Sequence, residues 1–166
     1  MTKIMIVEDD MDLRKIYSIR LTAEGYEVVS AGDGEEALAV AVKEQPELVI
    51  SDVMMPKISG FDMLDILRST PETKNIRVIM MTALSSDDQR ARGESLGADK
   101  YLVKSQVGME DVVNAVHEVL EDKVVSSVAP ETMQSAQQPA QPVQQPATPA
   151  PETIMGNLNN GANPAQ

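Results

Sequence analysis

The stretch Ile4-Met5-Ile6-Val7-Glu8-Asp9-Asp10 joins a run of aliphatic residues directly to a run of acids. An aliphatic run without polar alternation is typical of a parallel strand that is covered on both faces. Runs of the same kind recur at residues 48–50, 78–81 and 101–103, with a weaker one at residues 26–30. The pattern therefore predicts five short strands in a buried parallel sheet.

Segments with helical spacing lie between these runs. Their apolar positions are Leu13, Ile16, Tyr17 and Leu21; Ala37, Leu38 and Ala41; Phe61, Leu64 and Leu67; and Val112, Val113, Val116 and Leu120. A further helix is expected from Ser85 or Ser86 to Gly97, because serine caps helices and glycine ends them. Alternating strands and helices imply right-handed crossovers. We therefore predict an α/β, flavodoxin-like, doubly wound five-stranded parallel sheet of order 2-1-3-4-5 with five helices.

The composition of the chain changes at Lys123. Residues 124–166 contain no Lys, Arg or aromatic residue, but seven Pro and seven Gln. Such a sequence buries too little apolar surface to offset the entropy of ordering it. We predict a folded domain at residues 1–123 and a disordered Pro-, Gln- and Ala-rich tail at residues 124–166. Residues 153–158 are either a docking peptide or plain chain end.

Composition also narrows the functions open to the chain. A net charge of −12 disfavours direct binding of nucleic acid, because an acidic surface repels phosphate. The absence of Cys excludes disulfides and thiolate ligands and suits a reducing compartment. No apolar run approaches the roughly 20 residues that span a bilayer, and the N-terminus does not resemble a signal peptide. Membrane insertion is therefore not expected.

Polar side chains follow four of the predicted strands. Glu8 and Asp9 end the first strand, Asp52 the third, Thr82 the fourth and Lys104 the fifth. Sites in doubly wound sheets lie beyond the carboxyl ends of the strands, so these groups are expected to meet at one rim. Each alone has an ordinary explanation, such as an acid that caps the next helix. Together they indicate a functional site.

The expected rim is rich in negative charge. Crowded carboxylates repel each other, so one of them takes up a proton or a cation binds among them. Oxygen ligands without Cys favour a hard divalent ion such as Mg²⁺. A carboxylate nucleophile, a metal ion, a lysine and a hydroxyl are groups suited to phosphoryl transfer.

Four strings in the sequence resemble the receiver domains of two-component response regulators. They are Ile4-Met5-Ile6-Val7-Glu8-Asp9-Asp10, Leu48-Val49-Ile50-Ser51-Asp52-Val53-Met54-Met55-Pro56, Ile79-Met80-Met81-Thr82-Ala83 and Gly97-Ala98-Asp99-Lys100-Tyr101-Leu102-Val103-Lys104. The turn Ser59-Gly60-Phe61-Asp62 is similar to the family's as well. The resemblance covers about residues 3–122, in the family's order and spacing. It implies a cytoplasmic, single-domain response regulator.

The resemblance also implies a role for each acid. Asp52 is expected to take a phosphoryl group from the phosphohistidine of a histidine kinase or a histidine phosphotransfer protein. Asp52, Glu8, Asp9 and the backbone carbonyl of Met54 are expected to bind Mg²⁺. The chain would then catalyse only its own phosphorylation and dephosphorylation, and would not act as an enzyme on other substrates.

The remaining groups are expected to sense the phosphoryl group. The resemblance implies that Lys104 pairs first with Asp52 and then with the phosphoryl group. It also implies that Thr82 and Tyr101 form a switch, in which the hydroxyl moves toward a phosphoryl oxygen and the ring turns inward. The surface of residues 85–120 would then repack and bind a downstream protein or form a homodimer.

Three details depart from, or add to, the family pattern. The residue after Lys104 is Ser105, where receiver domains usually have Pro, often after a cis bond; a cis bond without Pro costs about 2.5–4 kcal/mol. Met54 and Leu84 flank the expected path of attacking water, and their apolar side chains predict slow hydrolysis of the acyl phosphate. His117 is expected to be a solvent-facing helix residue.

Three other functions fit parts of the sequence. A phosphatase of the haloacid-dehalogenase type requires a second acid two residues after the nucleophile, where this chain has Met54. A small flavin carrier has the same fold, but the chain lacks Trp and a Ser/Thr-rich phosphate loop after the first strand. The main alternative is a receiver-like scaffold that binds partners without being phosphorylated.

Overall fold

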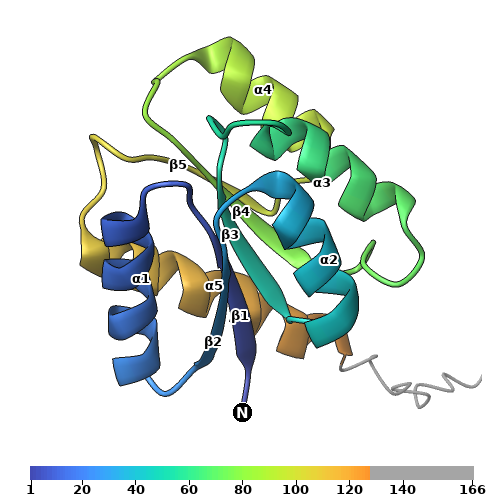
Figure 1. The fold of residues 1–166 in the computed structure, drawn as a ribbon. Helices are drawn as coiled ribbons and strands as arrows, with labels where there is room; N and C mark the ends of the chain where they lie inside the picture. Colours follow the sequence, from blue (N-terminus) through green and yellow to red (C-terminus); the bar gives the residue numbers. More distant parts are fainter. Residues whose placement is uncertain (128–166) are drawn as a thin grey trace, which may run out of the picture. The chain divides into compact units, whose positions relative to one another are not determined.

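The structure is a computed structural model that describes residues 1–127, and side chains up to residue 122. In this part of the chain five strands and five helices alternate (Figure 1). The strands are β1 (Lys3–Val7), β2 (Glu27–Ala31), β3 (Leu48–Asp52), β4 (Arg77–Thr82) and β5 (Lys100–Val103). The helices are α1 (Met11–Ala23), α2 (Gly34–Glu44), α3 (Gly60–Ser69), α4 (Asp87–Ser95) and α5 (Met109–Ser127).

All strand pairs are parallel, and the order in the sheet is β2-β1-β3-β4-β5, which confirms the predicted fold. Each strand extends one or two residues beyond the run that predicted it, or shifts by one, because backbone pairing continues into polar residues. Asp52, for example, still pairs with Met81 in the register between β3 and β4. The acceptor position predicted from sequence is thus the last residue of a central strand.

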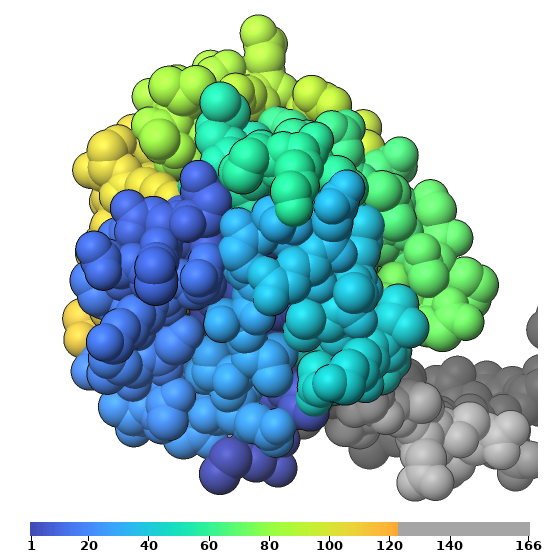
Figure 2. Space-filling view, in the orientation of Figure 1, coloured from blue at the N-terminus to red at the C-terminus, as the bar shows by residue number. Residues whose placement is uncertain are grey.

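Alternate residues of each strand enter two different cores. Met5, Val49 and Met80 pack with residues of α2 and α3, whereas Ile4 and Ile50 pack with residues of α1 and α5. Figure 1 shows these helices on opposite faces of the sheet. In the space-filling view the yellow-green atoms of α4 stand at the top of the picture (Figure 2). Burial on both faces explains why the strand sequences show no polar alternation.

The helix ends follow from local chemistry. Asp33 and Ser86 cap α2 and α4, each accepting a hydrogen bond from the backbone N–H three residues later; Ser86 is one of the two caps predicted for α4. Gly25 and Gly97 adopt φ of 92° after α1 and α4, a conformation that glycine reaches without steric cost. These two turns join the carboxyl ends of α1 and α4 to the amino ends of β2 and β5.

The prediction for α1 was wrong at one position. Tyr17 and Leu21 are buried, but the side chain of Ile16 is 51% exposed. Consecutive residues lie about 100° apart around a helix, so Ile16 falls outside the stripe that Tyr17 and Leu21 define. The two other helices with long apolar stripes, α3 and α5, bury the residues that predicted them, except that Leu120 is only partly buried.

Helix α5 continues to Ser127, beyond the predicted boundary at Lys123. The first proline after it is Pro130, so no helix-breaking residue interrupts the end of the helix. The rest of the predicted tail, including residues 153–158, lies outside the described residues. Among the helices of residues 1–127, none is both long and apolar enough to cross a membrane.

Helix α3 begins in direct contact with the end of β3. A Cβ atom on Gly60 would lie 2.2 Å from the carbonyl oxygen of Asp52 and 2.9 Å from the Cα of Val53. The Gly60 N–H also donates to the carbonyl oxygen of Val53 at 2.9 Å. Only glycine allows this approach of two backbones.

We therefore expect Gly60→Ala to lower the free energy of unfolding by about 1–3 kcal/mol, the usual cost of overpacking. Urea denaturation followed by circular dichroism measures this change. Gly108→Ala is the matched control, because the nearest atom to its added Cβ lies 3.6 Å away. Equal stabilities of the two variants would contradict the close contact at Gly60.

Candidate functional site

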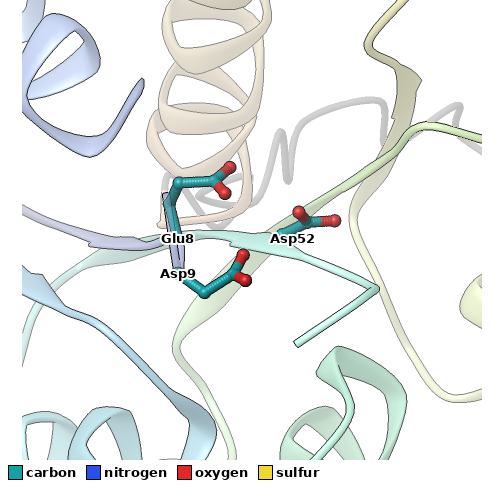
Figure 3. A group of neighbouring side chains, drawn as sticks. All are labelled: Glu8, Asp9 and Asp52. Carbon is teal, nitrogen blue, oxygen red and sulfur yellow. The ribbon is translucent and has the colours of Figure 1, made fainter. Parts of the chain in front are cut away.

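The predicted site residues lie together at the carboxyl ends of β1, β3, β4 and β5. Carboxylate oxygens of Glu8, Asp9 and Asp52 lie within 4.8 Å of one another. Figure 3 shows the carboxyl groups of Glu8 and Asp9 pointing from the end of β1 toward Asp52. The parallel register of β1 with β3 causes this meeting, because Val7 pairs with Ser51 and the next residues of both strands are acids.

Lys104 bridges two of these acids. Its Nζ donates to Glu8 Oε2 at 2.6 Å and to Asp52 Oδ2 at 2.7 Å. The Lys104 N–H donates to the carbonyl oxygen of Thr82 at 2.7 Å, which fixes the residue beside β4. Burial opposes the charged ammonium, but the hydrogen bonds to Asp52 and Glu8 raise the pKa of Lys104 above its ordinary value. The ammonium is therefore charged at neutral pH.

Asp52 is nearly enclosed, with 7% of its surface exposed. Its Oδ1 accepts a hydrogen bond from the Met54 N–H at 3.1 Å, while Oδ2 accepts from Lys104. Both oxygens are thus held in fixed directions at the end of β3. A carboxylate oriented in this way is suited to nucleophilic attack from the open side of the rim.

Glu8 and Asp9 differ in burial. Glu8 is 3% exposed, and burial raises the pKa of its carboxyl group although the Lys104 ammonium opposes the shift. Asp9 is exposed at the mouth of the site. The neighbouring Asp10 caps α1 by accepting from the N–H groups of Asp12 and Leu13, as an acid after a strand commonly does. Asp10 is therefore part of the helix start.

This cluster can hold a metal ion. Three carboxylates face one ammonium, so the site carries an excess of negative charge that a divalent cation would balance. All donors are oxygens, which suit Mg²⁺. The backbone N–H of Met54 donates to Asp52. That the carbonyl oxygen of Met54 is a further metal ligand remains a prediction.

Thr82 and Tyr101 are linked by a residue that sequence reasoning did not identify. The hydroxyl of Thr82 donates to Gln89 Oε1 at 3.3 Å, and the hydroxyl of Tyr101 donates to the same oxygen at 3.4 Å. Tyr101 is buried in this unmodified chain, so its ring already points inward. The only sequence signal for Gln89 was its place one turn into the helix that Ser86 caps, beside the strand ending in Thr82.

Two apolar residues lie two positions beyond Asp52 and Thr82 in the chain. Met54 and Leu84 are 58% and 52% exposed, so both side chains lie in solvent; their place on the path of attacking water remains a prediction. The peptide bond between Lys104 and Ser105 is trans, as are all peptide bonds in the described residues. His117 is exposed on α5, as predicted, and its ring meets the edge of Tyr26 at a centroid distance of 6.0 Å.

A second residue that the sequence analysis missed is Tyr17. It is buried on α1, and burial raises the pKa of its hydroxyl; the charge of Lys104 lowers this pKa to a smaller extent, and the charges of Glu8 and Asp52 raise it further. Its periodicity identified it only as a core residue. It shares a buried cluster with Ile4 and Ile6 of β1 and Ile50 of β3.

Known proteins are similar to this chain in sequence and fold. Residues 4–117 match the family described as the response regulator receiver domain. The probable transcriptional regulator ycf27 of Cyanophora paradoxa is 47% identical over 102 residues, which cover 61% of this chain and 41% of the relative. The DNA-binding dual master transcriptional regulator RpaA of Synechocystis sp. is 40% identical over 104 residues, covering 63% and 43%. The chain thus spans about two fifths of the length of these relatives.

Solved structures agree with the family match. The chemotaxis protein CheY4 of Vibrio cholerae is 34% identical with a TM-score of 0.68, covering 72% of this chain and 98% of that one. A CheY-like receiver domain protein of Methanospirillum hungatei is 27% identical with a TM-score of 0.71, covering 76% and 98%. With the matching sequence, the sheet order and the acids at the strand ends now in view, the chain belongs to the response regulator receiver domains of two-component signalling.

Proposed function

We propose that this chain is a phosphoacceptor response regulator that takes a phosphoryl group onto Asp52 and signals through contacts with other proteins. One observation carries the proposal. The carboxylate of Asp52 is enclosed and held by the Lys104 ammonium and the Met54 N–H, within 4.8 Å of the carboxylates of Glu8 and Asp9. A nucleophile, a fixed positive charge and a set of metal ligands are the parts that phosphoryl transfer uses.

The proposed reaction joins an oxygen of Asp52 to phosphorus and breaks the bond between phosphorus and the donor group. The donor is the imidazole nitrogen of a phosphohistidine, and the product is an acyl phosphate. The leaving imidazole keeps the electron pair of the broken bond and takes a proton from solvent. Positioning supplies most of the rate, because Lys104 and the Met54 N–H hold the attacking carboxylate in place.

Neutralisation of charge is proposed to supply the remaining part of the rate. Bound Mg²⁺ would neutralise charge that develops on the phosphoryl oxygens. Glu8, Asp9 and Asp52, with the carbonyl of Met54, are the groups proposed to hold it. The Lys104 ammonium lies within reach of Asp52 and is proposed to follow the phosphoryl group once it is attached, while the Thr82 hydroxyl donates to one of its oxygens.

The proposed setting is the cytoplasm, where a histidine kinase or a histidine phosphotransfer protein supplies the phosphoryl group. The output is a changed surface of residues 85–120 that binds a downstream protein or a second copy. We propose no direct contact with nucleic acid, because the chain carries a net charge of −12. The chain catalyses only its own phosphorylation and dephosphorylation.

Incubation with acetyl phosphate and Mg²⁺, followed by intact mass measurement, tests the proposal. We expect the wild-type chain to gain the mass of one phosphoryl group and Asp52→Ala to gain none, because the substitution removes the nucleophile. Asp88→Ala, which removes an exposed acid at the start of α4, is the control and is expected to react like the wild type. A wild-type chain that stays unmodified would instead favour a phosphorylation-independent scaffold.

The exposed side chain of Met54 generates a second prediction. We expect Met54→Asn to speed hydrolysis of the acyl phosphate by about three- to tenfold, since an amide there can hold water with one hydrogen bond. The decay of phosphorylated mass after removal of acetyl phosphate gives the rate. Ile66→Asn places the same amide on an exposed part of α3 and is expected to leave the rate unchanged. Equal decay of Met54→Asn and wild type would show that Met54 does not limit access of water.

The pairing of Lys104 with both Glu8 and Asp52 generates a third prediction. In EDTA we expect Lys104→Met to lower the free energy of unfolding by about 3 kcal/mol, because buried carboxylates lose their shared positive partner. Mg²⁺ is expected to stabilise this variant more than the wild type, since the ion restores the lost charge. Urea denaturation with and without Mg²⁺ measures both effects, and Lys74→Met, at an exposed lysine, is the control. An unchanged stability in EDTA would contradict a neutralising role for Lys104.

A further inference from the structure

Gln89 on α4 accepts hydrogen bonds from two hydroxyl groups. Its Oε1 lies 3.3 Å from Thr82 Oγ1 and 3.4 Å from the Tyr101 hydroxyl oxygen. Thr82 is fully buried and Tyr101 nearly so. An amide oxygen has two lone pairs, so both acceptor positions of Gln89 are used by these two side chains.

The hydroxyl of Thr82 has only one hydrogen to give. It accepts from the Leu84 N–H at 3.1 Å and donates its hydrogen to Gln89. A phosphoryl oxygen on Asp52 is an acceptor as well, so Thr82 can donate to it only after leaving Gln89. The two hydrogen bonds of Thr82 are therefore mutually exclusive.

Helix α4 depends on few contacts. Gly93 is its only buried residue, and a Cβ there would lie 3.1 Å from the Tyr101 ring. Beyond the end of the helix, Arg68 binds the carbonyl oxygen of Gly97 through Nη2 at 2.7 Å and Nε at 3.2 Å. Gln89 joins the first turns of α4 to Thr82 and Tyr101. An element with so little buried apolar surface shifts at low cost.

A hollow lies beside these first turns. It has a volume of about 220 Å³ and is lined by Ser86 and Arg90 of the α4 region, by Tyr101 of β5 and by Gln106 of the following loop. Most of its walls come from the start of α4 and from β5, which the hydrogen bond between Gln89 and Tyr101 joins. A change in the hydrogen bonds of Gln89 would therefore alter this part of the surface.

We propose that Gln89 is a positioning residue that holds the Thr82 hydroxyl away from the acceptor site and transmits its release to α4. The proposal rests on the proposed function, since it assumes that Thr82 donates to a phosphoryl group on Asp52. Before phosphorylation Gln89 keeps Thr82 and Tyr101 together. After phosphorylation Thr82 turns to the phosphoryl oxygen, Gln89 keeps only Tyr101, and the first turns of α4 move while the Arg68 contact holds the other end.

Two substitutions with opposite chemistry test this role. Gln89→Leu removes the acceptor at similar size, so Thr82 is released, and we expect the initial rate of phosphorylation by acetyl phosphate to rise about two- to tenfold. Gln89→Glu keeps the acceptor and adds a charge that binds the hydroxyl more tightly, so the rate is expected to fall by a similar factor. Intact mass measured over time, with Mg²⁺ present, gives both rates.

Ala91 provides the matched controls. Ala91→Leu and Ala91→Glu put the same two side chains on an exposed position of the same helix, and both are expected to react like the wild type. They separate the loss of the hydrogen bond from general effects of size and charge on α4.

Thr82→Val provides a second, independent arm, since it removes the hydroxyl and keeps the side-chain shape. In this background Gln89→Leu is expected to have no further effect on the rate, because the two side chains act through one hydrogen bond. A full effect of Gln89→Leu without the Thr82 hydroxyl would overturn the inference. So would equal rates for wild type, both Gln89 variants and both Ala91 controls, provided that the wild type is phosphorylated. A wild type that is never phosphorylated would overturn the proposed function and this inference together.

Discussion

The ammonium group of Lys104 between Glu8 and Asp52 is the interaction on which the site depends. Without a positive group the two buried carboxylates would repel each other at the end of adjacent strands, and one would have to take up a proton. The position of the ammonium is itself a product of the sheet. Lys104 directly follows β5, and its backbone is tied to Thr82 at the end of β4. The fold thus places one positive group, at the end of β5, between two negative groups at the ends of β1 and β3.

The two halves of the rim carry different kinds of side chain. On the side of β1 and β3 lie the acids that are proposed as metal ligands and nucleophile, at the ends of two strands that are buried on both faces. On the side of β4 and β5 lie hydroxyl groups that share one acceptor on a weakly packed helix. A rigid reaction site beside a movable reporter is the arrangement that a switch requires.

Most of the fold was predictable from the sequence, since continuous aliphatic runs and helical spacing determine a doubly wound sheet. The meeting of Glu8, Asp9, Asp52 and Lys104 also followed from strand ends alone. Ile16 was misplaced because an apolar residue at the edge of a stripe is indistinguishable by period from one inside it. Gln89 could not be predicted, because its role depends on how α4 lies against β4 and β5, and no local pattern encodes that distance.

The contact between Gly60 and the backbone of Asp52 has a consequence for how the connecting segment can change. The Val53 N–H donates to the carbonyl oxygen of Met81, and the Gly60 N–H donates to the carbonyl oxygen of Val53. Main-chain hydrogen bonds therefore hold both ends of the segment from Val53 to Gly60. Lengthening a surface loop costs little when its ends are already joined. Met55 and Ile58 pack against the core and Ser59 caps α3, so Pro56 and Lys57, which are exposed, are the positions where extra residues would least disturb the carboxylate at position 52.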